Sequence, residues 1–137
     1  MRTFRLDPRL ARDTLGVARL GLCELRLMND SRWPWVVLVP QREAITEFYE
    51  LSPLDQTMLT FETDLVARAF KALTGADKLN IATIGNVVSM FHLHIVARFA
   101  SDANWPGPVW GFGMAEPYEA ARAQALVSDI ARAVLPA

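Results

Sequence analysis

The residues of this chain most suited to chemistry are its two histidines, His92 and His94, which are separated by one leucine. On a β-strand alternate side chains point to opposite faces, so both imidazoles would lie on one face about 7 Å apart. The opposite face would carry only apolar side chains, those of Phe91, Leu93, Ile95 and Ala97. The sequence therefore predicts a strand that buries one face and presents two imidazoles on the other.

Two imidazoles at this spacing permit three interpretations. They can be ordinary strand residues that face solvent or form hydrogen bonds. They can supply half of a zinc or other transition-metal site, whose third ligand would come from an acidic residue or Cys23, because the chain has no other histidine. They can also act on phosphorus: one neutral imidazole attacks while a hydrogen bond holds its proton, and the second donates to the phosphate oxygens.

The residues around the pair favour the third interpretation. Residues 78–82 (Lys-Leu-Asn-Ile-Ala) and 85–96 (Gly-Asn-Val-Val-Ser-Met-Phe-His-Leu-His-Ile-Val) together resemble the signature region of the histidine triad superfamily. In that family a strand carries His-x-His-x-His and two apolar residues, after a Gly-Gln-Ser-type turn and an asparagine further upstream. The resemblance extends to the apolar strand that ends at Pro40 and to the long helix, and so covers most of the chain as far as Arg98.

The resemblance implies a role for each matching residue. His92 falls on the middle histidine, which attacks the α-phosphorus and becomes the nucleotidyl-histidine. His94 falls on the third histidine and would bind the non-bridging phosphate oxygens. Asn80 matches the asparagine that contacts the phosphate side of the substrate, and Asn86 matches the glutamine of the turn.

Four further positions matter in this comparison. Asn29 or Asp30 lies near the acidic position that binds the ribose hydroxyls, and the sequence leaves the choice between them open. Met90 stands where the first histidine is expected, so the chain resembles a two-histidine variant, with Met90 placed at the nucleotide pocket or in the core. Val87 stands where the family often has a serine that assists the leaving group. Neither departure removes the nucleophile.

The function that the resemblance implies is a nucleotide hydrolase or nucleotidyl transferase. Its substrates would be nucleoside phosphoramidates, phosphoanhydrides or dinucleoside polyphosphates, cleaved through a covalent His92 intermediate. Two alternatives remain: a nucleotide-binding module with slow or no turnover, and a metal-binding protein that uses the His-x-His pair. The leading interpretation needs no cofactor and no metal, and it implies a homodimer, as is common in the family.

The elements that must position these residues follow from capping residues and hydrophobic spacing. Asp7-Pro8 is a helix start, and the helix is expected to continue to about Leu15. Two strands, at 20–28 and 35–39, are expected to form a hairpin around the turn Asn29-Asp30-Ser31.

Ser52-Pro53 begins a long amphipathic helix that should end at Gly75. Its expected core-facing stripe consists of Leu54, Met58, Phe61, Leu65, Ala69 and Leu73. A second hairpin is expected from strands at 78–84 and 91–99, and a last helix from Glu116-Pro117 to Val134. These elements predict an α+β fold: one domain over residues 1–137, with an antiparallel sheet of about five strands covered by the long helix and the N- and C-terminal helices.

Composition excludes several classes of function. The formal net charge of −1 provides no positive field for nucleic acid. A single cysteine cannot form an intrachain disulfide, and the N-terminus lacks the apolar core of a signal peptide, so we expect a cytoplasmic protein. Residues 79–97 contain no charged side chain, but their asparagines and histidines make a membrane span costly, so we expect two buried strands and no membrane partner.

Two features beyond the histidine strand carry further expectations. The aromatic- and proline-rich segment 104–113 contains Trp105 and Trp110. One expectation is that it packs on the domain through its own aromatics. The alternative is that it closes one side of the His92 cleft or contacts a second subunit. Arg98, at the end of the strand, is expected to be a solvated strand end, with a phosphate contact as the alternative.

Overall fold

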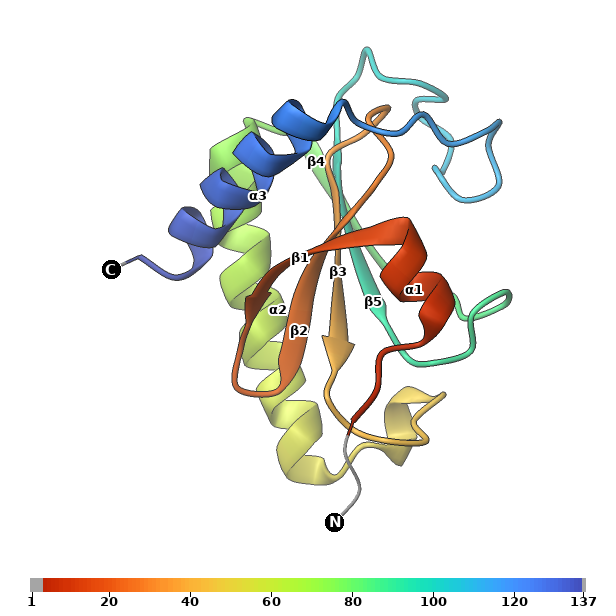
Figure 1. Cartoon of the computed structure of the whole chain (residues 1–137), viewed down its shortest axis with the longest axis vertical. Helices are drawn as coiled ribbons and strands as arrows, with labels where there is room; N and C mark the ends of the chain where they lie inside the picture. The colour runs from red at the N-terminus through yellow and green to blue at the C-terminus, as the bar shows by residue number, and fades with distance from the viewer. Residues whose placement is uncertain (1–3, 137) are drawn as a thin grey trace.

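The computed structural model describes residues 4–136; residues 1–3 and 137 of the predicted domain lie outside the described residues. Five antiparallel strands form one sheet in the order β1-β2-β3-β5-β4, with three α-helices packed on it (Figure 1). This architecture confirms the predicted α+β class. The elements are α1 (Pro8–Asp13), β1 (Thr14–Arg19), β2 (Cys23–Met28), β3 (Trp35–Pro40), the short 3₁₀ helix η1 (Phe48–Glu50), α2 (Pro53–Thr74), β4 (Lys78–Thr83), β5 (Leu93–Arg98) and α3 (Ala120–Val134).

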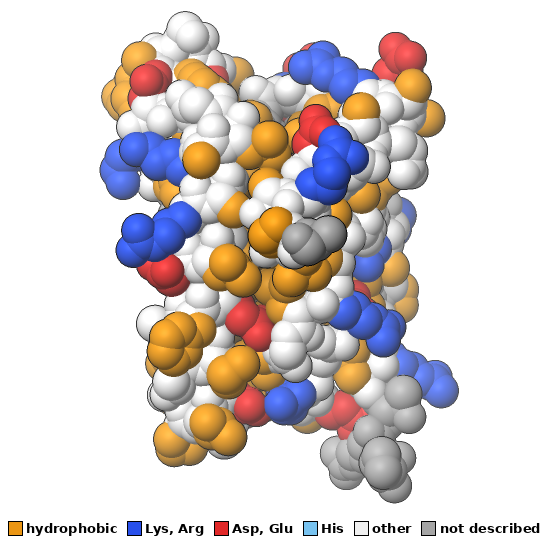
Figure 2. Space-filling model, turned by 90° about the vertical axis from the view of Figure 1, so that its left-hand side faces the viewer, with side chains coloured by type: hydrophobic (Ala, Val, Ile, Leu, Met, Phe, Trp, Pro, Cys, Tyr) orange, Lys and Arg blue, Asp and Glu red, His pale blue; other side chains and the backbone are white. Residues whose placement is uncertain are grey.

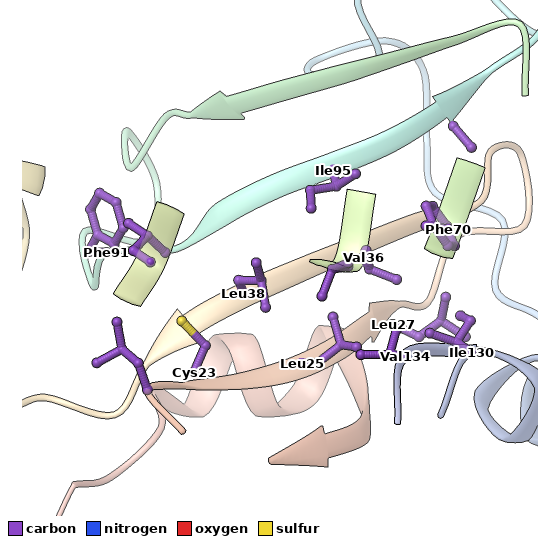
Figure 3. Packing of buried hydrophobic residues seen from close by; sticks show 14 of the residues in the cluster. Cys23, Leu25, Leu27, Val36, Leu38, Phe70, Phe91, Ile95, Ile130 and Val134 are labelled. Atoms are coloured by element: carbon purple, nitrogen blue, oxygen red, sulfur yellow. The ribbon is translucent and has the colours of Figure 1, made fainter. Parts of the chain in front are cut away.

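The two faces of the sheet are covered differently. Helices α2 and α3 lie side by side on one face, whereas α1 lies against the other (Figure 1). The larger apolar core fills the space between the sheet and the helix pair, with side chains from β2, β3, β5, α2 and α3 (Figure 3). A smaller apolar cluster on the opposite face contains Leu10 of α1, Trp33 and Trp35. That second face is the one that carries the histidines.

Helix α2 has the predicted ends. Ser52 accepts a hydrogen bond from the backbone N–H of Asp55, Pro53 occupies the first turn, and Gly75 ends the helix in the left-handed conformation (φ 70°). Glycine adopts this conformation without the steric cost of a Cβ atom. The capping signals in the sequence therefore located both ends of the helix.

The predicted buried face of α2 was wrong in most of its residues, although Met58 and Ala69 do pack against the core. The residues that α2 buries are Leu59, Glu62, Val66 and Phe70. In the expected stripe, Leu54 and Phe61 are 71% and 68% exposed. The cause is Glu62, whose buried carboxylate accepts hydrogen bonds from the backbone N–H groups of Leu22 (2.7 Å) and Cys23 (2.9 Å). These bonds fix the rotation of the helix on the sheet. A stripe predicted from apolar residues alone leaves out Glu62, because its side chain is charged.

Strand β1 was missed by the sequence analysis. The helix expected to reach Leu15 ends at Asp13, because Thr14 is extended and pairs with Met28 of β2. The register shifts between Gly16 and Ala18, an irregularity that interrupts the alternating pattern of a strand. Strand β1 therefore depends on pairing with β2 more than on its own sequence.

Helix α3 begins at Ala120, four residues after the predicted start at Glu116. The preceding segment is held by the β2–β3 turn, since Ser31 donates its backbone N–H to the Glu116 carbonyl and Asn29 accepts from the Tyr118 N–H. The first of these contacts occupies the Glu116 carbonyl, which a helix that began there would use as its first acceptor. Among the helices of residues 4–136, none combines the length and the apolar character that a membrane crossing requires.

Candidate active site

The two histidines lie together at the start of β5. His94 is the second residue of β5 and pairs with Val37 of β3 and Ala82 of β4, while His92 immediately precedes the strand. The predicted strand thus began two residues too early, yet the alternation holds, since Phe91 and Ile95 enter the helix-side core. The two imidazole centroids are 4.7 Å apart, with the ring planes at 66°. The expectation that the rings lie together is confirmed.

The backbone fixes the proton of His92. Its Nδ1 lies 2.7 Å from the carbonyl oxygen of Met90. A carbonyl can only accept, so Nδ1 must carry the hydrogen and donate it. The lone pair of the neutral ring therefore resides on Nε2, and an unprotonated imidazole nitrogen is a nucleophile.

The opposite arrangement holds at His94. The indole Nε1–H of Trp35 donates to Nδ1 of His94 over 3.0 Å. An indole N–H can only donate, so Nδ1 is the acceptor and the neutral ring carries its proton on Nε2. Burial, and to a lesser extent the neighbouring His92, lower the pKa of His94 to about 3. His94 is therefore a neutral donor at physiological pH.

This lowered pKa predicts a loss of stability in mild acid. The unfolded chain binds a proton on His94 below about pH 6.5, whereas the folded protein does not until about pH 3, so the free energy of unfolding falls as the pH drops between these values. From about pH 7 to about pH 5, the wild type should lose about 2 kcal/mol more than a His94→Gln variant. Urea unfolding of both proteins at the two pH values measures this difference, and equal losses would contradict it.

Both imidazoles line a cavity of about 460 Å³ on the α1 side of the sheet. Its walls are mostly apolar and come from α1, β2, β3, the β4–β5 loop and the aromatic segment: Leu10, Met28, Trp35, Ile84, Val87, Val88 and Trp110. Asn86 also lines the cavity, as predicted for a residue near the phosphate. The Arg9 guanidinium donates to the Val87 carbonyl (2.9 Å) and so ties α1 to the β4–β5 loop. The volume and lining suit a small organic ligand.

A second cavity of about 430 Å³ adjoins the first and contains the other predicted polar residues, Asn29 and Asp30. The two cavities share four lining residues, Asp13, Met28, Trp35 and Gly111. Burial raises the pKa of Asp30, but hydrogen bonds from Arg32 and from the Glu116 backbone outweigh it, and the pKa is lowered overall. Asp30 is thus a buried carboxylate, paired with Arg32 at 2.8 Å.

The aromatic segment, residues 104–113, forms one wall of the two adjoining cavities. Trp110 meets His94 edge-on at 5.4 Å between centroids, and Gly111 and Phe112 line the second cavity. The segment therefore packs on the domain through its own aromatics, with Trp110 against Trp35 and Phe112 against Trp33, and it closes one side of the cleft as well. The indole Nε1 of Trp110 is buried and has no hydrogen-bond partner among residues 4–136. Trp105 lies elsewhere, beneath the guanidinium of Arg98 at 5.5 Å.

Asn80 does not join the histidines in the cavity. It is on the same face of the sheet, paired with Val96, and its Oδ1 accepts a hydrogen bond from Arg98 at 2.9 Å. Arg98 itself is 1% exposed and forms two hydrogen bonds with the carboxylate of Asp102. The expectation of a solvated strand end was wrong, because an acidic partner four residues further on turns back over the strand.

Met90 has a structural position beside the site. Its sulfur accepts a hydrogen bond from the backbone N–H of Asp7 at 3.4 Å, its side chain packs against the smaller apolar cluster, and its carbonyl orients His92. The sequence predicted Trp35 only as a strand residue, so its hydrogen bond to His94 was not foreseen. The two residues that hold the histidines, Met90 through its backbone and Trp35 through its indole, could not be identified by residue type.

Within residues 4–136, no three His, Cys, Asp or Glu side chains are grouped as metal ligands. Of the three interpretations of the pair, the geometry fits phosphorus chemistry best, because two adjacent rings that line one cavity have opposite tautomers, with a lone pair on Nε2 of His92 and a hydrogen on Nε2 of His94.

Comparison with known proteins identifies the family. The family model described as "HIT domain" matches residues 11–101. A histidine triad (HIT) protein from Sinorhizobium meliloti is 56% identical, with a TM-score of 0.92 over 93% of this chain and 95% of that one. Histidine triad proteins from Bradyrhizobium japonicum (38% identity, TM-score 0.94, 97% and 99% covered) and Marinobacter aquaeolei (39%, 0.94, 97% and 97%) are also similar. Among curated proteins, none matches. The chain therefore belongs to the histidine triad family, whose members hydrolyse or transfer nucleotides.

Proposed function

We propose that this protein is a nucleotide hydrolase or nucleotidyl transferase that acts at the α-phosphorus through a covalent intermediate on His92. The observation that carries the proposal is that two adjacent imidazoles have opposite tautomers, one with its hydrogen on Nδ1 and the other with its hydrogen on Nε2. The carbonyl of Met90 leaves a lone pair on Nε2 of His92, and the indole of Trp35 leaves a proton on Nε2 of His94. In the cavity that both rings line, His92 would supply the nucleophile and His94 the hydrogen-bond donor.

The reaction would proceed in two displacements. Nε2 of His92 forms a bond to the α-phosphorus, and the bond from phosphorus to the leaving group breaks with its electron pair, which takes up a proton from solvent. The Nε2–H of His94 donates to a non-bridging oxygen as charge rearranges. Water or another acceptor then attacks phosphorus and gives up its proton to solvent, the phosphorus–nitrogen bond breaks, and the nucleotide leaves with the lone pair restored to His92.

The two adjoining cavities would hold the rest of the nucleotide. Asn29 and Asp30 line the cavity next to the histidines, where they would face the ribose, and Asn86 lines the histidine cavity, where it would serve the phosphate. Asn80, which lines neither cavity and accepts a hydrogen bond from Arg98, would not contact the phosphate directly. Met90, in the position of the first triad histidine, would contribute through its carbonyl, so that its replacement of a histidine leaves the orientation of the nucleophile intact.

Product partitioning tests the covalent intermediate. An adenosine 5′-phosphoramidate and an adenosine phosphoanhydride should be cleaved in water containing methanol. A common intermediate predicts the same ratio of AMP to its methyl ester from both substrates, because the leaving group has departed before the acceptor attacks. A ratio that changes with the leaving group would contradict the intermediate. Thermal stabilisation by AMP with no turnover of either substrate would identify a nucleotide-binding module instead.

We also propose that the protein is a homodimer that pairs through β4 and α2. Strand β4 is an edge of the sheet, and Ile81 on it is 47% exposed. Phe61 and Leu65 of α2, exposed by 68% and 42%, add an apolar surface on the helix-covered side, where Figure 2 shows hydrophobic side chains at the surface. A groove lined by Ala72 of α2 and Leu79 of β4 connects the two elements. Open edges and exposed apolar stripes are features of subunit surfaces.

A charge on this surface should prevent the pairing. Phe61→Glu is expected to shift the sedimentation coefficient from that of a dimer to that of a 15.3 kDa monomer at micromolar concentration, because an unpaired carboxylate would be buried. Phe48→Glu, at an exposed position of η1 outside this surface, is the matched control and should remain dimeric. A monomeric wild type would contradict the proposal directly.

A further inference from the structure

The imidazole of His94 is enclosed by three other aromatic rings. Trp35, Trp110 and His92 lie at centroid distances of 5.7, 5.4 and 4.7 Å. Of these contacts, the one from Trp35 is directional, because its Nε1–H donates to Nδ1 of His94. Trp35 and His94 lie diagonally on adjacent antiparallel strands, as Trp35 pairs with Val96 and His94 with Val37. Trp35 is itself only 8% exposed and packs against Trp33 and Trp110.

A neutral imidazole has two tautomers, and only one of them is useful at this position. With hydrogen on Nε2, His94 offers a donor; with hydrogen on Nδ1, it would present a lone pair at Nε2, which repels an anionic oxygen. In the second tautomer the Nδ1 hydrogen would also meet the Trp35 N–H, two donors at hydrogen-bonding distance. Trp35 therefore discriminates between the tautomers, and it holds the ring orientation as well.

We propose that Trp35 is a positioning residue, whose indole N–H fixes the tautomer and orientation of His94 and so maintains the donor that faces the substrate phosphate. Its effect on turnover rests on the proposed function, whereas its effect on the tautomer of His94 does not. The chain would then use two unlike devices for its two imidazoles: a backbone carbonyl that requires a proton on Nδ1 of His92, and an indole that forbids one on Nδ1 of His94.

Nitrogen NMR of the unmodified protein tests the assignment directly. The chain contains only two histidines, so [¹⁵N]histidine labelling gives four ring-nitrogen signals. Near neutral pH, one ring should show hydrogen on Nδ1 and the other on Nε2, and a His92→Asn variant assigns them. Hydrogen on Nδ1 of His94 in the wild type would overturn the proposal, whatever the activity of the protein.

Two substitutions at Trp35 separate the hydrogen bond from the bulk of the ring. Trp35→Phe removes the donor, and the His94 nitrogen signals should move toward values averaged over both tautomers while those of His92 stay fixed. Trp35→Gln restores an N–H donor with less bulk, and should restore the Nε2–H tautomer. Unchanged His94 signals in the folded Phe variant would overturn the proposal, as would averaged signals in both variants.

Turnover provides the second measurement. Loss of a residue that orients a functional histidine commonly costs about 10- to 100-fold in activity, so kcat of Trp35→Phe should fall by about that factor with a smaller change in KM. Trp35→Gln should recover part of kcat.

Trp33→Phe is the matched control, since Trp33 is a buried indole that donates to the Ala103 carbonyl. Its loss should destabilise the fold without altering the His94 signals; equal effects of Trp33→Phe on those signals would contradict a specific role for Trp35. If the tautomer shifts as predicted and no variant, including the wild type, turns over nucleotide, the proposed function fails while the tautomer assignment stands.

Discussion

Replacement of His92 by asparagine is expected to lower nucleotide turnover by about 10⁴-fold or more, the loss seen when a covalent nucleophile is removed. The asparagine amide can still donate to the Met90 carbonyl, as Nδ1 of His92 does over 2.7 Å, so the segment before β5 should keep its conformation. What the variant lacks is the Nε2 lone pair. Single-turnover assays with an adenosine phosphoramidate, together with AMP binding by calorimetry, should show lost chemistry and retained binding.

His94→Gln gives the comparison for this variant. Its side-chain amide can still offer a donor on the cavity side. Even complete loss of one oxyanion-type donor costs only about 10²- to 10³-fold, so its defect should be smaller than that of His92→Asn. A larger defect in the His94 variant would reverse the two roles. Turnover by His92→Asn within tenfold of wild type would show that another group attacks phosphorus.

Replacement of Arg98 by methionine is expected to lower the free energy of unfolding by about 3–5 kcal/mol. The side chains of Arg98 and Asp102 are 1% and 7% exposed, and the pair is joined by two hydrogen bonds of 2.8 and 2.9 Å. Without the guanidinium, the Asp102 carboxylate stays buried, keeps the backbone N–H of Phe99 as a donor but has no cation beside it, and Asn80 loses the hydrogen bond from Arg98. Urea unfolding followed by tryptophan fluorescence measures the change.

The control for this variant is Arg68→Met, which removes an ion pair of similar sequence spacing from the surface of α2. Arg68 and Asp64 are 80% and 59% exposed, so the pair is screened by solvent and its loss should leave the urea midpoint unchanged. Equal midpoints for Arg98→Met and the wild type would show that the buried pair contributes nothing net. A double variant with Asp102→Leu should regain part of the loss, because no unpaired charge then remains.

The features that could be predicted from the sequence are those that depend on residues close together in the chain. Both ends of α2 followed from Ser52, Pro53 and Gly75, and the central strand β3 followed from its apolar run. The pairing of His92 and His94 on one face followed from strand alternation alone. In each case neighbouring residues carry the signal, so no knowledge of the tertiary fold was required.

The features that the sequence did not predict depend on distant contacts. The buried face of α2 is selected by Glu62, which binds backbone groups about 40 positions earlier in the chain. The partner of His94 is Trp35, 59 positions away, and the burial of Arg98 depends on how the following turn returns Asp102 to the strand. A buried carboxylate, an indole donor and a buried arginine each appear in a sequence as residues with an ordinary surface or core role, and only the folded arrangement gives them their partners.

Trapping of the intermediate tests the central claim most directly. The wild-type protein should be mixed with an adenosine phosphoramidate, quenched within milliseconds to seconds under alkaline denaturing conditions that preserve phosphorus–nitrogen bonds, and analysed by intact mass and peptide mapping. A nucleophilic His92 predicts a mass increase of one adenylyl group, located on His92 and absent from His92→Asn. An adenylyl group on another residue, or steady turnover with no adduct on His92 at any quench time, would contradict it.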